Sequence, residues 1–283
     1  MVNQIDATAF REFELAGWQR ATEHYADVFG ALTAQAVPEI LAAIGIAPGL
    51  KLLDVATGPG YVAAAAHEQG AIVAGIDFSP AMVAEARRRS PAVTFSEGDA
   101  EALPFPDHSF DAIVMSFGLL HLARPELAIA EAHRVLRYGG RYAFTVWARP
   151  DEAVGFGAAL NAIEAHGRLD VGLPPGPPFF RFSDHRECAN CLEQAGFAHI
   201  EIRQLPLVWH VASPDAVFEA LMRGGVRTAA VLRAQTPEAL NRIREAISDA
   251  MQPFVKGSTV AIPMPAILAS GVKRGTAPFS GPR

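Results

Sequence analysis

The chain has 283 residues, a formal net charge of −6, and 50% hydrophobic against 19% charged residues. This length suits one α/β domain with insertions and a sizeable buried core. The negative charge argues against a broad phosphate-binding surface, so no nucleic-acid partner is expected. No apolar run approaches the roughly 20 residues that span a bilayer, and the first residues lack a secretory signal, so the sequence predicts a cytoplasmic protein without a membrane span.

Helical patterning opens the chain, and a βαβ pattern follows it. Residues 8–46 predict two helices that cover the first strand, the second ended by Pro48-Gly49. Apolar runs then alternate with segments of helical spacing, which predicts a mostly parallel sheet with helices on both faces. The predicted strands are 51–56, 72–76, 92–95, 110–116 and 140–147, and the predicted helices between them are 60–69, 80–89 and 125–137.

A glycine- and proline-rich stretch, 150–182, follows the core and predicts a lid loop around a helix at 153–166. Beyond it the pattern predicts a helix at 184–195, a strand at 199–210, helix over 214–252 and a last strand at 259–269. We therefore expect a single domain over 1–274, with a core at about 47–149, an N-terminal helical cover at 8–46, lid insertions at about 150–182 and 213–257, and a loose tail at 275–283.

Three successive strand ends carry the residues that point to a ligand. The first strand runs into a turn, Ala56-Thr57-Gly58-Pro59-Gly60, whose glycines allow a ligand to approach the backbone closely. The second strand ends at Asp77, a position that suits the hydroxyls of a ribose. The third leads to Asp99, whose carboxylate can accept a hydrogen bond from an adenine amino group. Together they predict a nucleoside-binding crevice.

These motifs, with Asp54, Gly98-Asp99-Ala100 and Ser109-Phe110-Asp111-Ala112-Ile113-Val114, resemble those of class I S-adenosylmethionine methyltransferases. The similarity is closest to the ubiquinone/menaquinone C-methyltransferase-like group, methyltransferase type 11, and covers roughly residues 50–147. Tyr138 stands where the group usually has proline, and Ala63 where a third glycine often lies. The resemblance implies a Rossmann-like α/β fold with a seven-stranded sheet and a helical lid, and S-adenosylmethionine as the cofactor.

The resemblance also implies where that cofactor binds. The turn 56–60 should face the methionine moiety, Asp77 the ribose, Phe78 and Met82 the adenine edge, and Asp99 with Ala100 the adenine ring. Tyr25 is the expected cap over the methionine end, although Trp18 and Tyr25 also fit the buried face of an ordinary helix. The full predicted cofactor site is Tyr25, Asp54, Ala56, Thr57, Gly58, Pro59, Gly60, Asp77, Phe78, Ser79, Met82, Asp99, Ala100, Glu101, Ser116 and Phe117.

The expected reaction is in-line transfer of a methyl group to a small apolar or aromatic acceptor, which needs a base only if the acceptor loses a proton. His121, just after the fourth strand, is the first candidate base, and His210 is the second. Both also fit structural histidines. The covering segments contain Phe179, Phe180, Phe182, Trp209 and Phe218, which favour a lid core over an acceptor site. The acceptor atom and the oligomeric state stay open, with a homodimer as one option.

Three alternatives remain at this point. Cys188 and Cys191 fit an arsenite methyltransferase, but their spacing places them on the buried face of a helix, which favours inert thiols. Two cysteines without partner histidines supply no closed metal site, so no metal is expected. A glycine turn followed by an acid also fits a nicotinamide oxidoreductase, against which Asp54 and Asp99 argue. A non-catalytic module that binds S-adenosylmethionine is the third alternative.

Overall fold

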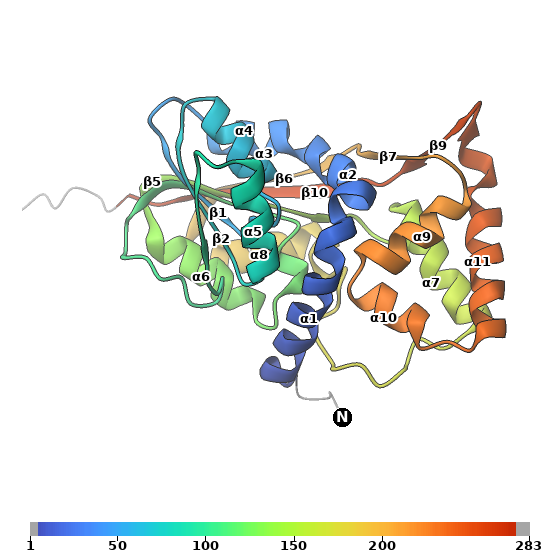
Figure 1. Cartoon of the computed structure of the whole chain (residues 1–283). Helices are drawn as coiled ribbons and strands as arrows, with labels where there is room; N and C mark the ends of the chain where they lie inside the picture. The colour runs from blue at the N-terminus through green and yellow to red at the C-terminus, as the bar shows by residue number, and fades with distance from the viewer. Residues whose placement is uncertain (1–4, 276–283) are drawn as a thin grey trace, which may run out of the picture.

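Seven strands form one sheet in the order β3-β2-β1-β4-β5-β10-β6, in a computed structural model that describes residues 5–275 (Figure 1). Strands β1 to β5 are parallel, whereas β10 runs antiparallel to both of its neighbours. The predicted mostly parallel seven-stranded sheet is confirmed. Its strands are β1 Lys51–Val55, β2 Ile72–Asp77, β3 Thr94–Glu97, β4 Phe110–Ser116, β5 Leu136–Trp147, β6 Phe197–Leu205 and β10 Ala266–Lys273.

Helices cover both faces of this sheet. α3 (Val37–Ile44) and α4 (Tyr61–Glu68) pack together on one face, and α6 (Pro125–Val135) and α8 (His185–Gln194) pack together on the other (Figure 1). α5 (Pro80–Arg89) follows β2 and begins at Ser79, whose hydroxyl accepts a hydrogen bond from the Met82 amide. Proline in the first turn of α3, α5 and α6 presets the backbone for a helix and gives up only an amide that has no partner there.

The N-terminal cover is one nearly continuous helical run rather than the two separate helices that the sequence predicts. α1 (Ala7–Tyr25) begins at Asp6, whose carboxylate accepts from the amides of Thr8 and Ala9. It continues through the π-helical turn η1 (Ala26–Gly30), α2 (Ala31–Thr33) and η2 (Ala34–Ala36) into α3. The linking residues 26–36 contain no proline, and Gly30 among them keeps helical backbone angles of −56° and −49°, which explains the continuity.

The run Ala7–Ile44 is long and apolar enough to cross a membrane by length and composition alone, with a mean hydropathy of 1.3 over its most apolar window. Half of that window is buried inside the protein. A core helix passes the same criterion, so the run is weak evidence for a membrane span.

The lid is a second group of elements beside the sheet. α1 stands between the sheet and this group, which contains α7, α9, α10 and α11 (Figure 1). The helices of the lid are α7 Val154–His166, η4 Arg181–Ser183, α9 Asp215–Gly224, α10 Arg227–Arg233, α11 Pro237–Met251 and η5 Gln252–Phe254. The lid also contains a three-stranded sheet of β7 Val208–Val211, β9 Thr259–Pro263 and β8 Val255–Lys256.

The strands predicted at 199–210 and 259–269 are each divided between two sheets. Pro206 interrupts the first, so that β6 stays in the main sheet and β7 joins the small one. Pro265 interrupts the second in the same way between β9 and β10. Proline lacks the amide that a central strand must donate, which makes these the points where the chain changes sheets. The helical segment predicted at 214–252 is three helices, and residues 276–283 of the predicted tail lie outside the described residues.

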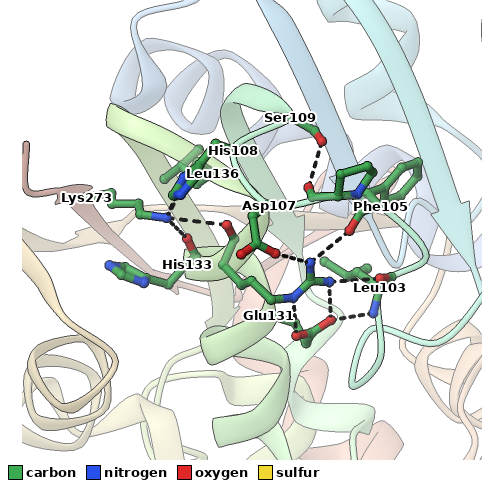
Figure 2. A network of polar contacts seen from close by, with 11 residues as sticks. Leu103, Phe105, Asp107, His108, Ser109, Glu131, His133, Leu136 and Lys273 are labelled. Atoms are coloured by element: carbon green, nitrogen blue, oxygen red, sulfur yellow. Dashed lines mark hydrogen bonds and ion pairs between the residues drawn. The ribbon is translucent and has the colours of Figure 1, made fainter.

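A polar network fixes the chain between β3 and β4 against the end of α6 (Figure 2). The Arg134 guanidinium donates to the carbonyl oxygens of Leu103 at 2.9 Å and Phe105 at 2.8 Å. Lys273, at the end of β10 and 3% exposed, donates to the Leu136 carbonyl at 2.9 Å. Lys273 also donates to the carbonyls of His133 and Arg134, in the last turn of α6, which lack partners within the helix. The network therefore holds in place the segment that follows Asp99.

Candidate functional site

A cavity of about 390 Å³ opens at the carboxyl ends of β1, β2 and β4. β1 lies between β2 and β4, so the order of the strands reverses at this point. Open α/β sheets bind their ligands at such a reversal. α1 contributes Arg11, Trp18 and Tyr25 to the lining, so the N-terminal cover forms one wall. The volume falls in the range of about 300–1,000 Å³ that is usual for small-molecule sites.

Asp54, one residue before β1 ends, fixes the turn that follows. Its Oδ2 accepts from the Thr57 hydroxyl at 2.7 Å and from the Ala63 amide at 3.1 Å. The side chain is buried, and burial raises the pKa of the carboxyl to about 7, although both hydrogen bonds lower it. Asp54 therefore ties the strand to the first turn of α4, as expected for a carboxylate that binds turn groups.

Asp77 joins the ends of two neighbouring strands. Its Oδ2 accepts from the Gly58 amide at 2.8 Å and its Oδ1 from the Ser79 amide at 2.9 Å. Burial raises the pKa of this carboxyl to about 6, against the lowering effect of the two amides. Because Asp77 lines the cavity beside the glycine turn, its oxygens are available to hydroxyl groups of a bound sugar.

The backbone is unusual where β1 and β4 end. Ala56 and Phe117 both have positive φ, 53° and 55°, which side-chain-bearing residues rarely adopt. A Cβ added to Gly118 would lie 2.5 Å from the Ala56 Cβ, so the two turns touch at this point. Both strained residues line the cavity. Strained backbone of this kind is concentrated at binding sites, where the surrounding packing holds it.

The far end of the cavity is lined by Asp99, Ala100 and Glu101 after β3. Asp99 accepts from the Glu101 amide at 2.9 Å and forms an ion pair with Arg11 of α1. Glu101 pairs with Arg124 at 2.8 Å. Asp99 is only 25% exposed, so a carboxylate lies within reach of a purine-sized group that enters between α1 and β3.

Tyr25 lines the opposite part of the cavity. Its hydroxyl donates to Thr33 Oγ1 at 3.3 Å, and its ring packs edge-on against Trp18 at 5.6 Å. Burial raises the pKa of the phenol to about 12, so the hydroxyl stays protonated at neutral pH. Tyr25 therefore combines the two interpretations that the sequence leaves open, since it packs in the helix and also faces the cavity.

His121 lines the cavity just beyond β4, in the short helix η3 (Leu119–His121). Its Nδ1 lies 2.9 Å from Oε2 of Glu14, a carboxylate of α1 that is 2% exposed. The sequence gives no sign that Glu14 is functional, because a lone glutamate in an amphipathic helix belongs to no motif. Only its spacing to Phe10, Gly17 and Ala21, which share the buried face of α1, marks it.

Comparison with known proteins places the chain among methyltransferases. Residues 53–144 match the model of a family described as "Methyltransferase domain". A demethylmenaquinone methyltransferase of Beutenbergia cavernae is 43% identical over 180 residues, which cover 58% of this chain and 72% of that relative. The ubiquinone/menaquinone biosynthesis C-methyltransferase UbiE of Methylobacterium nodulans is 35% identical over 172 residues, covering 55% and 68%. The chain belongs to the class I S-adenosylmethionine-dependent methyltransferases.

Other relatives of this methyltransferase match over shorter lengths or in fold alone. A demethylmenaquinone methyltransferase of Renibacterium salmoninarum is 40% identical over 111 residues, and the match spans only 47% of its length. The YcgJ protein of Bacillus subtilis superposes with a TM-score of 0.57 at 19% identity, over 86% of this chain and 99% of its own. Phosphoethanolamine N-methyltransferase 2 of Haemonchus contortus gives 0.58 at 18% identity, over 94% and 60%.

The cavity of this methyltransferase fits S-adenosylmethionine, the cofactor of the class. It offers carboxylates at three strand ends to a ligand that carries a sulfonium and an ammonium group, and it has glycine turns where a backbone must be approached closely. Of the predicted cofactor residues, only Gly60 and Ser79 do not line it; both support the turns next to it. The membership in this class also overturns the nicotinamide oxidoreductase alternative.

The remaining candidates lie away from the cavity. His210 is exposed on β7, where it pairs with Ala261 of the small sheet, and it does not line the cavity. Cys188 and Cys191 are buried in α8, and the Cys188 thiol donates to the Phe182 carbonyl. Their placement supports the inert thiols that the helical spacing predicts.

The aromatic residues of the lid divide into two groups. Phe182, Trp209 and Phe218 are 3%, 3% and 5% exposed and belong to the core, as the sequence favours. Phe179 is half-buried, and its ring lies edge-on to the His121 ring at 5.8 Å. One lid aromatic therefore reaches the neighbourhood of the candidate base.

Proposed function

We propose that this methyltransferase transfers the methyl group of S-adenosylmethionine to a small aromatic acceptor that carries an ionisable hydroxyl group, of the hydroquinone type. The single observation that carries the proposal is the position of His121, on the cavity wall and in contact with the rings of Trp18 and Phe179. The names of the demethylmenaquinone methyltransferases support the same acceptor class.

The cofactor is assigned to the strand-end residues. Asp77 holds the ribose, Asp99 and Ala100 the adenine, and Met82 packs against the adenine edge; the turn 56–60 and Tyr25 hold the methionine end. When bound there, S-adenosylmethionine supplies an electrophilic methyl group. The protein's task is then to hold a nucleophile in line at about 3–3.5 Å and to exclude water, which α1 achieves by covering the cavity.

His121 is assigned the role of general base. An aromatic carbon is a poor nucleophile unless a neighbouring hydroxyl is ionised, and a base at the ring raises that fraction. The Trp18 and Phe179 rings lie edge-on to the imidazole at 4.8 and 5.8 Å, so part of its surroundings is aromatic. A planar ring can pack against the same surface, which matches the apolar or aromatic acceptor that the sequence predicts. We also expect a small-molecule partner and a cytoplasmic location.

The test is a methyl-transfer assay with S-adenosylmethionine labelled in its methyl group. The acceptor panel contains a demethylmenaquinol with a short side chain, simple hydroquinones and catechols, and phosphoethanolamine, histamine and arsenite as acceptors of other chemistry. We expect label on the aromatic compounds, and NMR of the product distinguishes a C-methyl from an O-methyl group. Turnover of phosphoethanolamine, histamine or arsenite with none of the aromatic compounds would contradict the proposal.

A further inference from the structure

We propose that Glu14 is the positioning residue for His121, so that helix α1 both covers the cavity and orients the general base. The inference rests on the proposed function for the chemistry, and on geometry for the assignment. Glu14 belongs to the N-terminal cover and His121 to the core, 107 positions later in the chain. One hydrogen bond thus connects the wall that closes the site with the group that would accept a proton in it.

A buried glutamate is energetically unfavourable on this face of α1. The buried face of α1 consists of Phe10, Glu14, Gly17 and Ala21, and Glu14 is the one carboxylate among them. A carboxylate that is 2% exposed costs free energy unless it is paired, and an apolar side chain there would pack at no such cost. In the described part of the chain its side chain has one hydrogen-bond partner, His121. The position therefore favours a residue kept for its effect on the imidazole.

The imidazole is held in one orientation. Glu14 engages Nδ1 at 2.9 Å, while Trp18 and Phe179 contact the ring edge-on at 4.8 and 5.8 Å. His121 lines the cavity and Glu14 does not, so the carboxylate approaches the ring from behind the cavity wall. A carboxylate at Nδ1 favours the tautomer with the proton on that nitrogen, which leaves Nε2 free to accept a proton.

An electron pair of the acceptor forms the bond to the methyl carbon, the bond from that carbon to sulfur breaks, and its electron pair stays on sulfur. The proton released by the acceptor passes to His121 Nε2. The imidazolium that results lies against the Glu14 carboxylate, whose negative charge stabilises it.

Other charged groups contribute to the electrostatics here. Asp77 faces His121 from β2; burial raises the pKa of Asp77 to about 6, and a positive charge on His121 acts in the opposite direction. Arg227 of α10 lies over the Phe10 and Phe13 rings, and burial lowers the pKa of Arg227 while Glu14 raises it. The pH dependence of transfer therefore reflects Glu14, His121, Asp77 and Arg227 together, and the test has to change Glu14 alone.

Two substitutions separate the charge of Glu14 from its hydrogen bond. Glu14→Gln keeps a hydrogen-bond acceptor but removes the charge. Glu14→Leu removes both and makes the buried face of α1 entirely apolar. We expect kcat to fall roughly 10- to 100-fold in each, the usual effect of losing a carboxylate that orients a functional histidine. KM for the acceptor and Kd for S-adenosylhomocysteine should change less than about threefold. Glu23→Gln, an exposed position of α1, is the matched control.

Three further readouts distinguish positioning from a merely structural role. In Glu14→Gln the pH profile of kcat should differ from that of the wild type, because the negative charge beside the imidazole is gone. In Glu14→Leu the ¹⁵N shifts of His121 should show less of the Nδ1–H tautomer. The pair His121→Ala and Glu14→Gln combined should be no slower than His121→Ala alone, since Glu14 acts through the ring.

Wild-type kcat and an unshifted pH profile in both Glu14 variants would overturn the assignment. A double variant whose kcat falls by the product of the two single-variant losses would overturn it as well. A loss of S-adenosylhomocysteine binding in both variants would also overturn it, because Glu14 would then support the cavity rather than the base. A wild-type protein that binds S-adenosylhomocysteine but methylates nothing on the panel contradicts the proposed function instead. In that case an unchanged His121 tautomer in Glu14→Leu still overturns the positioning role and a changed one supports it.

Discussion

The Gly58 amide donates a 2.8 Å hydrogen bond to Asp77 Oδ2 and thereby links the turn after β1 to the end of β2. The bond gives a buried carboxylate a donor and fixes the glycine turn, where φ of Gly58 is 52°. The two parts of the cofactor site that lie 19 positions apart in the chain are thus held as one unit.

The contribution of Asp54 to the stability of the folded chain should fall as the pH rises from about 4 to about 7. Folded Asp54 keeps its proton up to a pKa of about 7, whereas the ordinary value is 3.8. The native state then binds more protons than the unfolded state in this window, so the free energy of unfolding decreases with pH. Asp54→Asn removes this contribution and leaves the smaller one of Asp77. Urea unfolding at pH 5 and pH 8 should show a smaller difference for the variant.

The control for that experiment is Asp249→Asn, an exposed position on α11. It should keep the wild-type difference between the two pH values. If Asp54→Asn also kept it, the buried carboxyl would not be the source of the pH dependence.

His121→Ala should reduce methyl transfer at every pH. A positioned general base contributes about 10²- to 10⁴-fold, and we expect kcat to drop within that range. Binding of S-adenosylhomocysteine, measured by calorimetry, should stay close to that of the wild type, since the strand-end carboxylates are intact. His210→Ala is the matched histidine control on an exposed strand and should retain kcat. Turnover in His121→Ala equal to the wild type would remove the base from the mechanism.

The two cysteines should be unreactive in the native protein. Burial raises the pKa of the Cys188 thiol to about 12, and burial also raises that of Cys191. A thiolate, not a thiol, reacts with disulfide reagents and binds soft metalloids, so the native chain should neither titrate with an aromatic disulfide reagent nor bind arsenite tightly. Both thiols should react with the disulfide reagent once the protein is denatured. Tight arsenite binding that disappears in Cys188→Ser would restore the arsenite alternative.

The sequence predicts the core of this fold well because its signals are local. A strand, a glycine turn and a proline-started helix each depend on neighbouring residues, so β1, β2 and α5 lie within a residue or so of their predicted bounds. Asp54, Asp77 and Asp99 follow the same logic, since parallel strands bring their carboxyl ends to one edge.

The division of the two lid strands between sheets and the role of Glu14 depend on distant contacts, which local patterns do not predict. Pro206 and Pro265 interrupt apolar runs that look continuous, and only the packing of the second sheet shows where each part belongs. The Glu14–His121 bond joins segments 107 positions apart. Periodicity places Glu14 on the buried face of a helix but gives no partner for it.

Calorimetric titration with S-adenosylmethionine, S-adenosylhomocysteine and NADH tests the central claim most directly. The wild type should bind the first two and not NADH. Asp77→Ala should weaken both by about 10- to 100-fold, because a hydrogen bond to a charged group is worth about 1.5–3 kcal/mol, while Asp249→Ala should bind as the wild type does. Binding of NADH alone, or S-adenosylmethionine affinity that Asp77→Ala leaves unchanged, would contradict the assignment of this cavity.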